Sequence, residues 1–114
     1  GKGEGALVTF EGIVRPEGPA AEQGHLDYDA YAPMARKKLG QVVDEAKQRF
    51  EVLEVAIAHR HGAVPVGEVS VAIAVTAKHR QAAFEACAFA ITRVKEIVPI
   101  WKMQGDACAG TMPP

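Results

Sequence analysis

A lysine interrupts the apolar face of the helix that the sequence predicts at about residues 79–98. With residues placed at 100° steps from Phe84, Lys95 falls within a stripe whose other members are Cys87, Ala88, Ile91, Val94 and Val98. In one interpretation, Lys95 extends its ammonium to solvent and stabilises the negative C-terminal end of the helix. In the other, partial desolvation favours the neutral amine, which then serves in proton transfer or as a nucleophile. Lys102, seven residues later, is either a second lysine of the same cleft or an ordinary exposed side chain.

Basic residues at the start of the same predicted helix indicate an anion site. Lys78, His79 and Arg80 precede or open the helix, where unpaired backbone N–H groups and the helix dipole favour a negative ligand such as phosphate. The alternative is a solvated basic cap with no ligand. Arg15, at the end of a predicted strand, is a further anion donor.

The triplet of His59, Arg60 and His61 supplies more donors, each weak by itself. Histidines two positions apart on a strand can share a metal, but no carboxylate or cysteine at ligand spacing accompanies them, so we expect no metal site. Cys87 lies in the apolar arc and is expected to be buried filler, whereas Cys108 lies in a tail without pattern. No Ser-His-Asp signature, Walker loop or GxGxxG motif is present.

Length and composition indicate a single globular domain over residues 1–114. The chain is 48% hydrophobic and 24% charged, with a net charge of −1, which disfavours a nucleic acid backbone or an acidic membrane surface as the main partner. Two cysteines are too few for a disulfide framework, so we expect a reducing compartment, by default the cytoplasm. The longest stretch without Asp, Glu, Lys or Arg has nine residues, far short of the ~20 that span a bilayer.

Hydrophobic periodicity predicts an α+β fold with a mainly antiparallel sheet, two helices and the order ββαββαβ. Gly12 marks either a bulge or a close backbone approach. The expected elements are a strand at 5–14, a mobile loop at 16–24, a strand at 25–31, a helix from Pro33 to about 50, strands at 52–61 and 69–76 around a turn at 62–67, a helix at about 79–98 and an extended segment at 100–103.

Five segments, in order over nearly the whole chain, resemble the large, catalytic subunit of molybdopterin synthase. They are GALVTFEGIVR (5–15), LDYDAYAPMA (26–35), AHRHG (58–62), VTAKHRQAAFEAC (75–87) and VKEIVPIWKM (94–103). The most specific parts are HRQAAFEAC, which opens the helix, and VPIWK, which follows it and sets two lysines seven residues apart.

The resemblance implies an α/β hammerhead fold and a sulfurtransferase. Such enzymes convert cyclic pyranopterin monophosphate to molybdopterin by installing two dithiolene sulfurs. The sulfur arrives as a thiocarboxylate on the C-terminal Gly-Gly of a small ubiquitin-like carrier subunit, and the family forms a homodimer within a heterotetramer. No metal or redox cofactor is expected, because the sulfur comes already activated.

The resemblance also implies roles for individual residues. Lys95 and Lys102 match the catalytic lysines; we assign Lys95 to the carrier's C-terminus and Lys102 to an acid, base or electrostatic role. The positions that match substrate contacts are Ile13, Val14, Arg15, His79, Arg80, Met103 and Gln104.

Three features depart from the family pattern. Met103 and Gln104 replace a common basic and acidic pair, Asp27 replaces a usual glutamate, and the tail after Gly105 is short. Two alternatives to this enzyme stay open. One is a noncatalytic partner-binding module on the same fold, and the other is a different phosphopterin- or nucleotide-binding enzyme.

Overall fold

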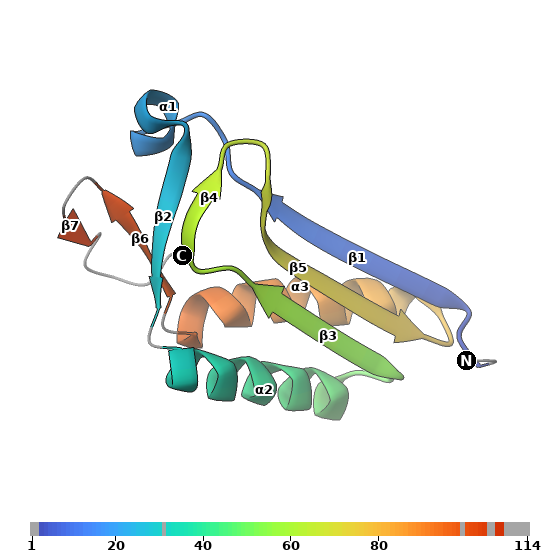
Figure 1. Ribbon diagram of the computed structural model, residues 1–114. Helices are drawn as coiled ribbons and strands as arrows, with labels where there is room; N and C mark the ends of the chain where they lie inside the picture. The colour runs from blue at the N-terminus through green and yellow to red at the C-terminus, as the bar shows by residue number, and fades with distance from the viewer. Residues whose placement is uncertain (1–2, 31, 99, 105–106, 109–114) are drawn as a thin grey trace.

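A three-stranded antiparallel sheet forms the centre of the computed structural model, which describes residues 3–30, 32–98, 100–104 and 107–108. Its strands are β1 (Ala6–Ile13), β5 (Val69–Ala77) and β3 (Glu54–His59), in the order β1-β5-β3 (Figure 1). The central strand β5 is rich in β-branched residues, and its alternate residues from Val71 to Ala77 are buried. Its period of two directs one face of the sheet to the hydrophobic core.

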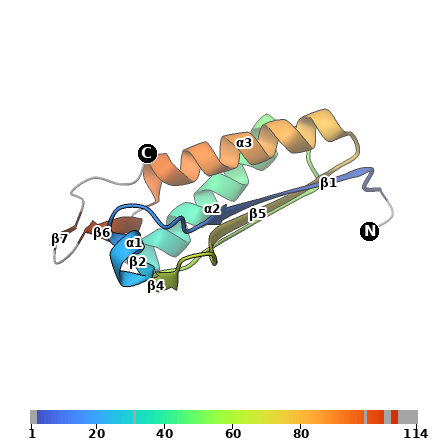
Figure 2. The same cartoon turned by 90° about the horizontal axis from the view of Figure 1, so that it is seen from above.

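Two long helices cover that one face (Figure 2). They are α2 (Ala32–Arg49), in which Val42 and Ala46 are fully buried, and α3 (Arg80–Ile97). The buried face of α3 consists of small residues and one valine, which let the helix approach the sheet closely: Ala83, Ala86, Cys87, Ala90 and Val94. None of the helices in the described part of the chain is long and apolar enough to cross a membrane.

An ion pair fixes the C-terminal half of α3 against α2. Arg93 Nε donates to Glu45 Oε1 at 2.8 Å, and Nη2 donates to Oε2 at 3.4 Å. The Arg93 guanidinium and the Gln41 amide lower the pKa of the Glu45 carboxyl. Because Arg93 precedes Lys95 by two positions, this contact also helps to orient the last turn of α3.

A second antiparallel sheet lies at one end of the molecule (Figure 1). It has the order β4-β2-β6-β7 and contains β2 (His25–Ala30), β4 (Gly62–Pro65), β6 (Ile100–Gln104) and β7 (Ala107–Cys108). Tyr28 of the inner strand β2 pairs with Gly62 on one side and with Lys102 on the other. The segment after α3 therefore returns beside β2, on the side opposite β4.

The predicted α+β class with antiparallel sheets is confirmed, but three local predictions are wrong. The segment predicted as a loop contains the short helix α1 (Pro19–Gln23), which begins with proline and ends at Gly24 in the left-handed region with φ 80°. The predicted turn at 62–67 contains β4, whose Pro65 is tolerated on an edge strand. Cys108 lies in β7 rather than in a tail without pattern.

Both alternatives predicted for Gly12, a bulge and a close approach, are found. The register of β1 on β5 shifts between Gly12 and Ile13, and a Cβ placed on Gly12 would lie 2.7 Å from Val71 Cγ1. The absent side chain thus allows β1 and β5 to approach just before β1 ends near Arg15.

We expect Gly12→Ala to lower the free energy of unfolding by roughly 1–3 kcal/mol, because the added methyl displaces the buried Val71 side chain. Gly40→Ala is the matched control. Gly40 is exposed in α2 with no atom within 4 Å of an added Cβ, so this change should raise stability by about 0.5–1 kcal/mol. Urea denaturation measures both, and equal effects of the two substitutions would contradict the close approach at Gly12.

Candidate active site

A cavity of about 200 Å³ opens where the central sheet, β2 and the C-terminal end of α3 meet. Its volume is below the roughly 300–1,000 Å³ of pockets that enclose whole drug-sized ligands. It therefore accommodates part of a ligand or the end of a chain. The residues that line it are Phe10, Gly12, Ile13, Arg15, Tyr28, His59, Ser70, Val71, Ile91, Val94, Lys95 and Val98.

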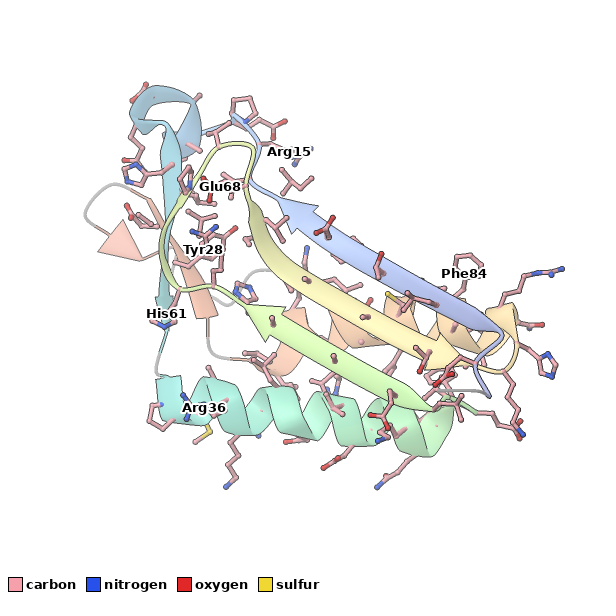
Figure 3. The ribbon with its side chains drawn as sticks, turned by 45° about the vertical axis from the view of Figure 1, so that its right-hand side comes forward. Arg15, Tyr28, Arg36, His61, Glu68 and Phe84 are labelled. Carbon is pink, nitrogen blue, oxygen red and sulfur yellow. The ribbon has the colours of Figure 1, made fainter. Side chains whose placement is uncertain are left out.

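Arg15 reaches this cavity from the loop that follows β1 (Figure 3). The backbone of the preceding Val14 is held by two hydrogen bonds, from Val14 N to Glu68 O at 3.0 Å and from Gly67 N to Val14 O at 2.9 Å. The Arg15 side chain is three-quarters exposed and pairs with Glu17 at 3.2 Å. An exposed ion pair of this kind contributes little to the free energy of folding. The guanidinium can therefore leave Glu17 and bind an anionic ligand with little loss of stability.

Lys95 lines the same cavity from the last turn of α3, and its side chain is exposed. The neighbouring Val94 and Val98 are buried, whereas Phe84 and Ala88 are exposed. The predicted stripe is therefore divided into a buried face and an exposed flank, and Lys95 belongs to the flank. In the isolated chain the Lys95 side chain is thus exposed to solvent, as the first interpretation of this residue expects.

The three sequence-predicted residues after α3 are placed only by their backbone. Lys102 pairs with Tyr28, which lines the cavity, and this brings the strand that carries Lys102 beside the Arg15–Lys95 region. Met103 and Gln104 pair with Cys108 and Ala107. The side chains of Lys102, Met103 and Gln104 lie outside the described part of the chain, so their contacts stay predictions.

The structure separates His79 and Arg80 from the cavity. His79 is the N-cap of α3 and Arg80 its first residue, and both side chains are exposed. At 1.5 Å rise per residue, Arg80 lies roughly 22 Å along the helix from Lys95. No side chain caps this helix N-terminus, so its first N–H groups are open to an anion, but not to one bound beside Arg15 of the same chain.

Of the residues predicted from the sequence as site residues, Arg15, Ile13 and Lys95 line the cavity. His59 was predicted only as a weak anion donor, and Tyr28 had no predicted role. Tyr28 is buried, and its ring meets the edge of the His59 ring at a centroid distance of 5.5 Å. Val14, predicted as a substrate contact, is buried in the core and does not line the cavity. The position of His59 at the cavity depends on the pairing of the AHRHG segment with the strand that contains Tyr28. This pairing joins segments distant in the sequence, so local sequence patterns do not indicate it.

His59 has a defined environment at the end of β3. Its Nδ1 lies 2.7 Å from the Arg60 carbonyl oxygen. Burial is the main cause that lowers the pKa of this imidazole, and the charge on His61 acts in the same direction, against the hydrogen bond to Arg60, which raises it. His59 is therefore neutral over a wider range below neutral pH than an exposed histidine.

The described residues contain no group of three or more His, Cys, Asp or Glu side chains able to hold a metal ion. Cys87 is buried in the core, as predicted, and burial raises the pKa of its thiol. A buried thiol of this kind is a poor nucleophile.

Comparisons with known proteins bear on this arrangement. A family model described as the MoaE protein matches residues 1–97. A curated relative from Thermoplasma volcanium, named molybdopterin synthase catalytic subunit, is 46% identical over 98 residues, covering 86% of this chain and 72% of the relative.

Two solved structures have the same fold. The X-ray crystal structure of molybdopterin synthase from Staphylococcus aureus matches with a TM-score of 0.80 at 38% identity, over 95% of this chain and 80% of that one. A complex of subunits 1 and 2 of the molybdopterin-converting factor from Helicobacter pylori matches with a TM-score of 0.75 at 30% identity, over 90% and 66% of the two chains. The fold class is thus that of molybdopterin synthase structures. The chain belongs to the MoaE protein family, which confirms the resemblance seen in the sequence.

The lowered pKa of His59 predicts a specific pH dependence of stability. Between about 6.5, the ordinary histidine pKa, and the lower value in the folded state, the unfolded chain binds more protons. The free energy of unfolding should therefore fall as pH falls below about 6.5. Urea denaturation at pH 7.5 and 5.5 should show a smaller loss in His59→Gln than in the wild type.

His61→Gln serves as the control, because His61 is exposed and adjacent. The His61→Gln chain should lose nearly as much free energy of unfolding between pH 7.5 and pH 5.5 as the wild type does. Carboxylates with lowered pKa values, such as Glu45, change the free energy of unfolding only below about pH 4.5. They therefore do not affect the difference between pH 7.5 and pH 5.5. A His59→Gln chain as acid-sensitive as the wild type would contradict the assigned burial of His59.

Proposed function

We propose that this chain performs the catalytic role of molybdopterin synthase in molybdenum cofactor biosynthesis. In this role it transfers sulfur from the thiocarboxylate of a small carrier subunit to cyclic pyranopterin monophosphate. One observation carries the proposal: in a chain of the MoaE protein family, Arg15 and Lys95 converge on one cavity whose Tyr28 wall pairs with the strand of Lys102. The Helicobacter pylori neighbour, a complex of two subunits, supports a small partner subunit.

The size and exposure of the cavity suit the end of a carrier chain. A Gly-Gly terminus has no side chains, so it can enter a space of about 200 Å³ as bare extended backbone. Lys95 is exposed in the isolated chain, and a docked carrier would cover it and exclude water. The ammonium then stabilises the negative charge that develops at the carrier's acyl group, where a low dielectric strengthens the interaction.

The phosphate of the substrate needs cationic partners. Arg15 is one, and its exposed pair with Glu17 leaves it available for a stronger bidentate contact. His79 and Arg80 are roughly 22 Å from Lys95 in the same chain, so we propose that a second copy of the chain supplies them to the site. The homodimer implied by the resemblance would bring His79 and Arg80 of one copy to the cavity of the other.

No resident metal or redox cofactor takes part in this proposal, because the thiocarboxylate arrives activated. The chain's own residues bind the phosphate, hold the carrier terminus and stabilise charge. A cytoplasmic location, where such a substrate and a reduced thiol pool coexist, belongs to the same proposal.

Dithiolene formation in vitro tests this function. The purified chain, thiocarboxylated carrier and cyclic pyranopterin monophosphate are combined, and the product is detected after oxidation to its fluorescent form. Lys95→Ala and Lys102→Ala should each reduce the rate at least about 100-fold, the effect expected when charge stabilisation in a desolvated site is lost. Carrier binding is measured separately by calorimetry.

Lys37→Ala is the matched control, since Lys37 is an exposed helical lysine on α2 away from the cavity. It should keep the wild-type rate. Full activity of Lys95→Ala would refute the assigned role of Lys95. Tight carrier binding by a wild-type chain that forms no product would instead favour the noncatalytic partner-binding module.

Mixed dimers test whether two copies share each site. Arg15→Ala and His79→Ala homodimers should both be inactive, whereas subunit exchange leaves one intact site in every heterodimer. Random mixing makes half of the dimers heterodimers, so about a quarter of the wild-type activity should return. If mixing restores no activity, each site is contained within one subunit.

A further inference from the structure

The transfer chemistry requires a proton acceptor that neither Arg15 nor the carrier provides. After the thiocarboxylate sulfur has bonded to the pterin side chain, the carrier's acyl carbon is still attached to that sulfur as a thioester. Water must form a bond to the acyl carbon, the carbon–sulfur bond must break, and its electron pair stays on sulfur as a thiolate of the product. The carrier leaves with a carboxylate, and water gives up two protons, one of which needs a base at the moment of attack.

We propose that His59 accepts the proton of the water molecule that releases the carrier after each sulfur transfer. The inference rests on the proposed function, and it assigns a catalytic residue beyond the lysines. His59 lines the cavity together with Arg15 and Lys95, so its ring adjoins the space that the acyl group would occupy. The second proton leaves the new carboxyl group for solvent.

The hydrogen bond of His59 determines which ring nitrogen is basic. A carbonyl oxygen only accepts, so Nδ1, at 2.7 Å from the Arg60 oxygen, must carry the ring proton. In the neutral imidazole Nε2 then holds the free lone pair. The Tyr28 ring contacts the imidazole at an interplanar angle of 72° and helps to fix its orientation.

Among the polar side chains that line the cavity, His59 is the one best suited to accept a proton. Among the described residues that line the cavity, the other polar side chains are Arg15, Lys95, Tyr28 and Ser70. Arg15 keeps its proton under all ordinary conditions, and the Ser70 hydroxyl donates to the Gly12 oxygen at 3.2 Å. Histidine is the side chain whose ordinary titration lies closest to neutral pH, and burial keeps His59 neutral and able to accept.

Nearby groups outside the cavity have other partners or are exposed. Arg60 pairs with Glu68 at 2.8 Å, and His61 is exposed beside the start of β4. His61 therefore offers a control of the same chemical type two positions away. A change at His61 alters the local charge but removes no cavity group.

Single-turnover reactions of His59→Gln, His59→Asn and His61→Gln test the assignment. The reactions are quenched with acid, and intact mass spectrometry follows the carrier–pterin thioester while fluorescence follows the dithiolene. Both His59 variants should form the thioester at the wild-type rate but accumulate it, with dithiolene formation slowed about 100-fold. The wild-type rate should fall at acidic pH, at values below the ordinary histidine range because burial lowers the pKa of His59, and this limb should vanish in the His59 variants.

Added imidazole should partly restore the rate of His59→Gln, which a merely structural role would not produce. His61→Gln should match the wild type in rate and adduct level near neutral pH, and it should keep the acidic limb of the pH profile, moved to higher pH because the His61 charge no longer lowers the pKa of His59. Wild-type dithiolene rates in folded His59→Gln, or a loss of product without thioester accumulation, would overturn the assignment of His59 while leaving the proposed function intact. A wild-type chain that makes no dithiolene would overturn both.

Discussion

The packing of α3 on the central sheet is the constraint on which the site depends. Ala83, Ala86 and Ala90 are fully buried, and their small side chains let the helix lie close above β5 and β1. Replacing any of them with a larger residue would push α3 from the sheet, at a cost of about 1–3 kcal/mol for overpacking. Because the helix and strands are rigid, this contact aligns the ends of α3 with the ends of β1.

That alignment distributes the basic residues to two ends of the molecule. At one end, Gly5 donates from its backbone N to the Ala77 oxygen at 3.0 Å, beside the start of α3 at His79. At the other end, the loop after β1 sets Arg15 beside the last turn of α3 with Lys95. A ligand with one small phosphate can bridge only groups at one end, so one phosphate can contact both basic clusters only if they come from two molecules.

The second sheet completes the cavity through pairings between distant segments. The inner strand β2 joins Gly62 and Lys102 on its two sides at Tyr28, and the Tyr28 ring contacts the ring of His59 at the end of β3. The cavity thus combines Arg15 from the loop after β1 and Lys95 from α3 with His59 from the central sheet and Tyr28 from the second sheet. Cations stabilise developing negative charge, and a neutral imidazole accepts protons, so the two tasks fall to side chains from different elements around one cavity.

Sequence periodicity predicted the elements whose signal is local. The β-branched run of β5 and the apolar spacing of Val42 and Ala46 in α2 each identify their own element. Proline at the start of α1 and Gly24 at its end were local signals too, but the short segment has no apolar stripe, so it was taken for a loop.

Other parts of the fold could not be predicted because they depend on tertiary contacts. Helical spacing alone placed Phe84 and Ala88 on the same stripe as Val94, whereas the packing of α3 against the central sheet and α2 determines which side of the helix is covered. The β2–β4 and β2–β6 pairings join segments tens of residues apart, so nothing in the local pattern of AHRHG identified His59 as a cavity residue. Helical periodicity identified Lys95 within an apolar stripe but left open whether its side chain is covered, and Lys102 was matched by resemblance and spacing alone.

The most direct test of the central claim, that the carrier's C-terminus enters the cavity beside Lys95, is a zero-length crosslink. The carrier's terminal carboxylate is activated with a carbodiimide in the complex, and the linked lysine is identified by peptide mass spectrometry. The account predicts that the carrier's last glycine joins mainly to Lys95 or Lys102. A glycine joined mainly to Lys37 or Lys47 on α2 would place the carrier elsewhere and contradict it.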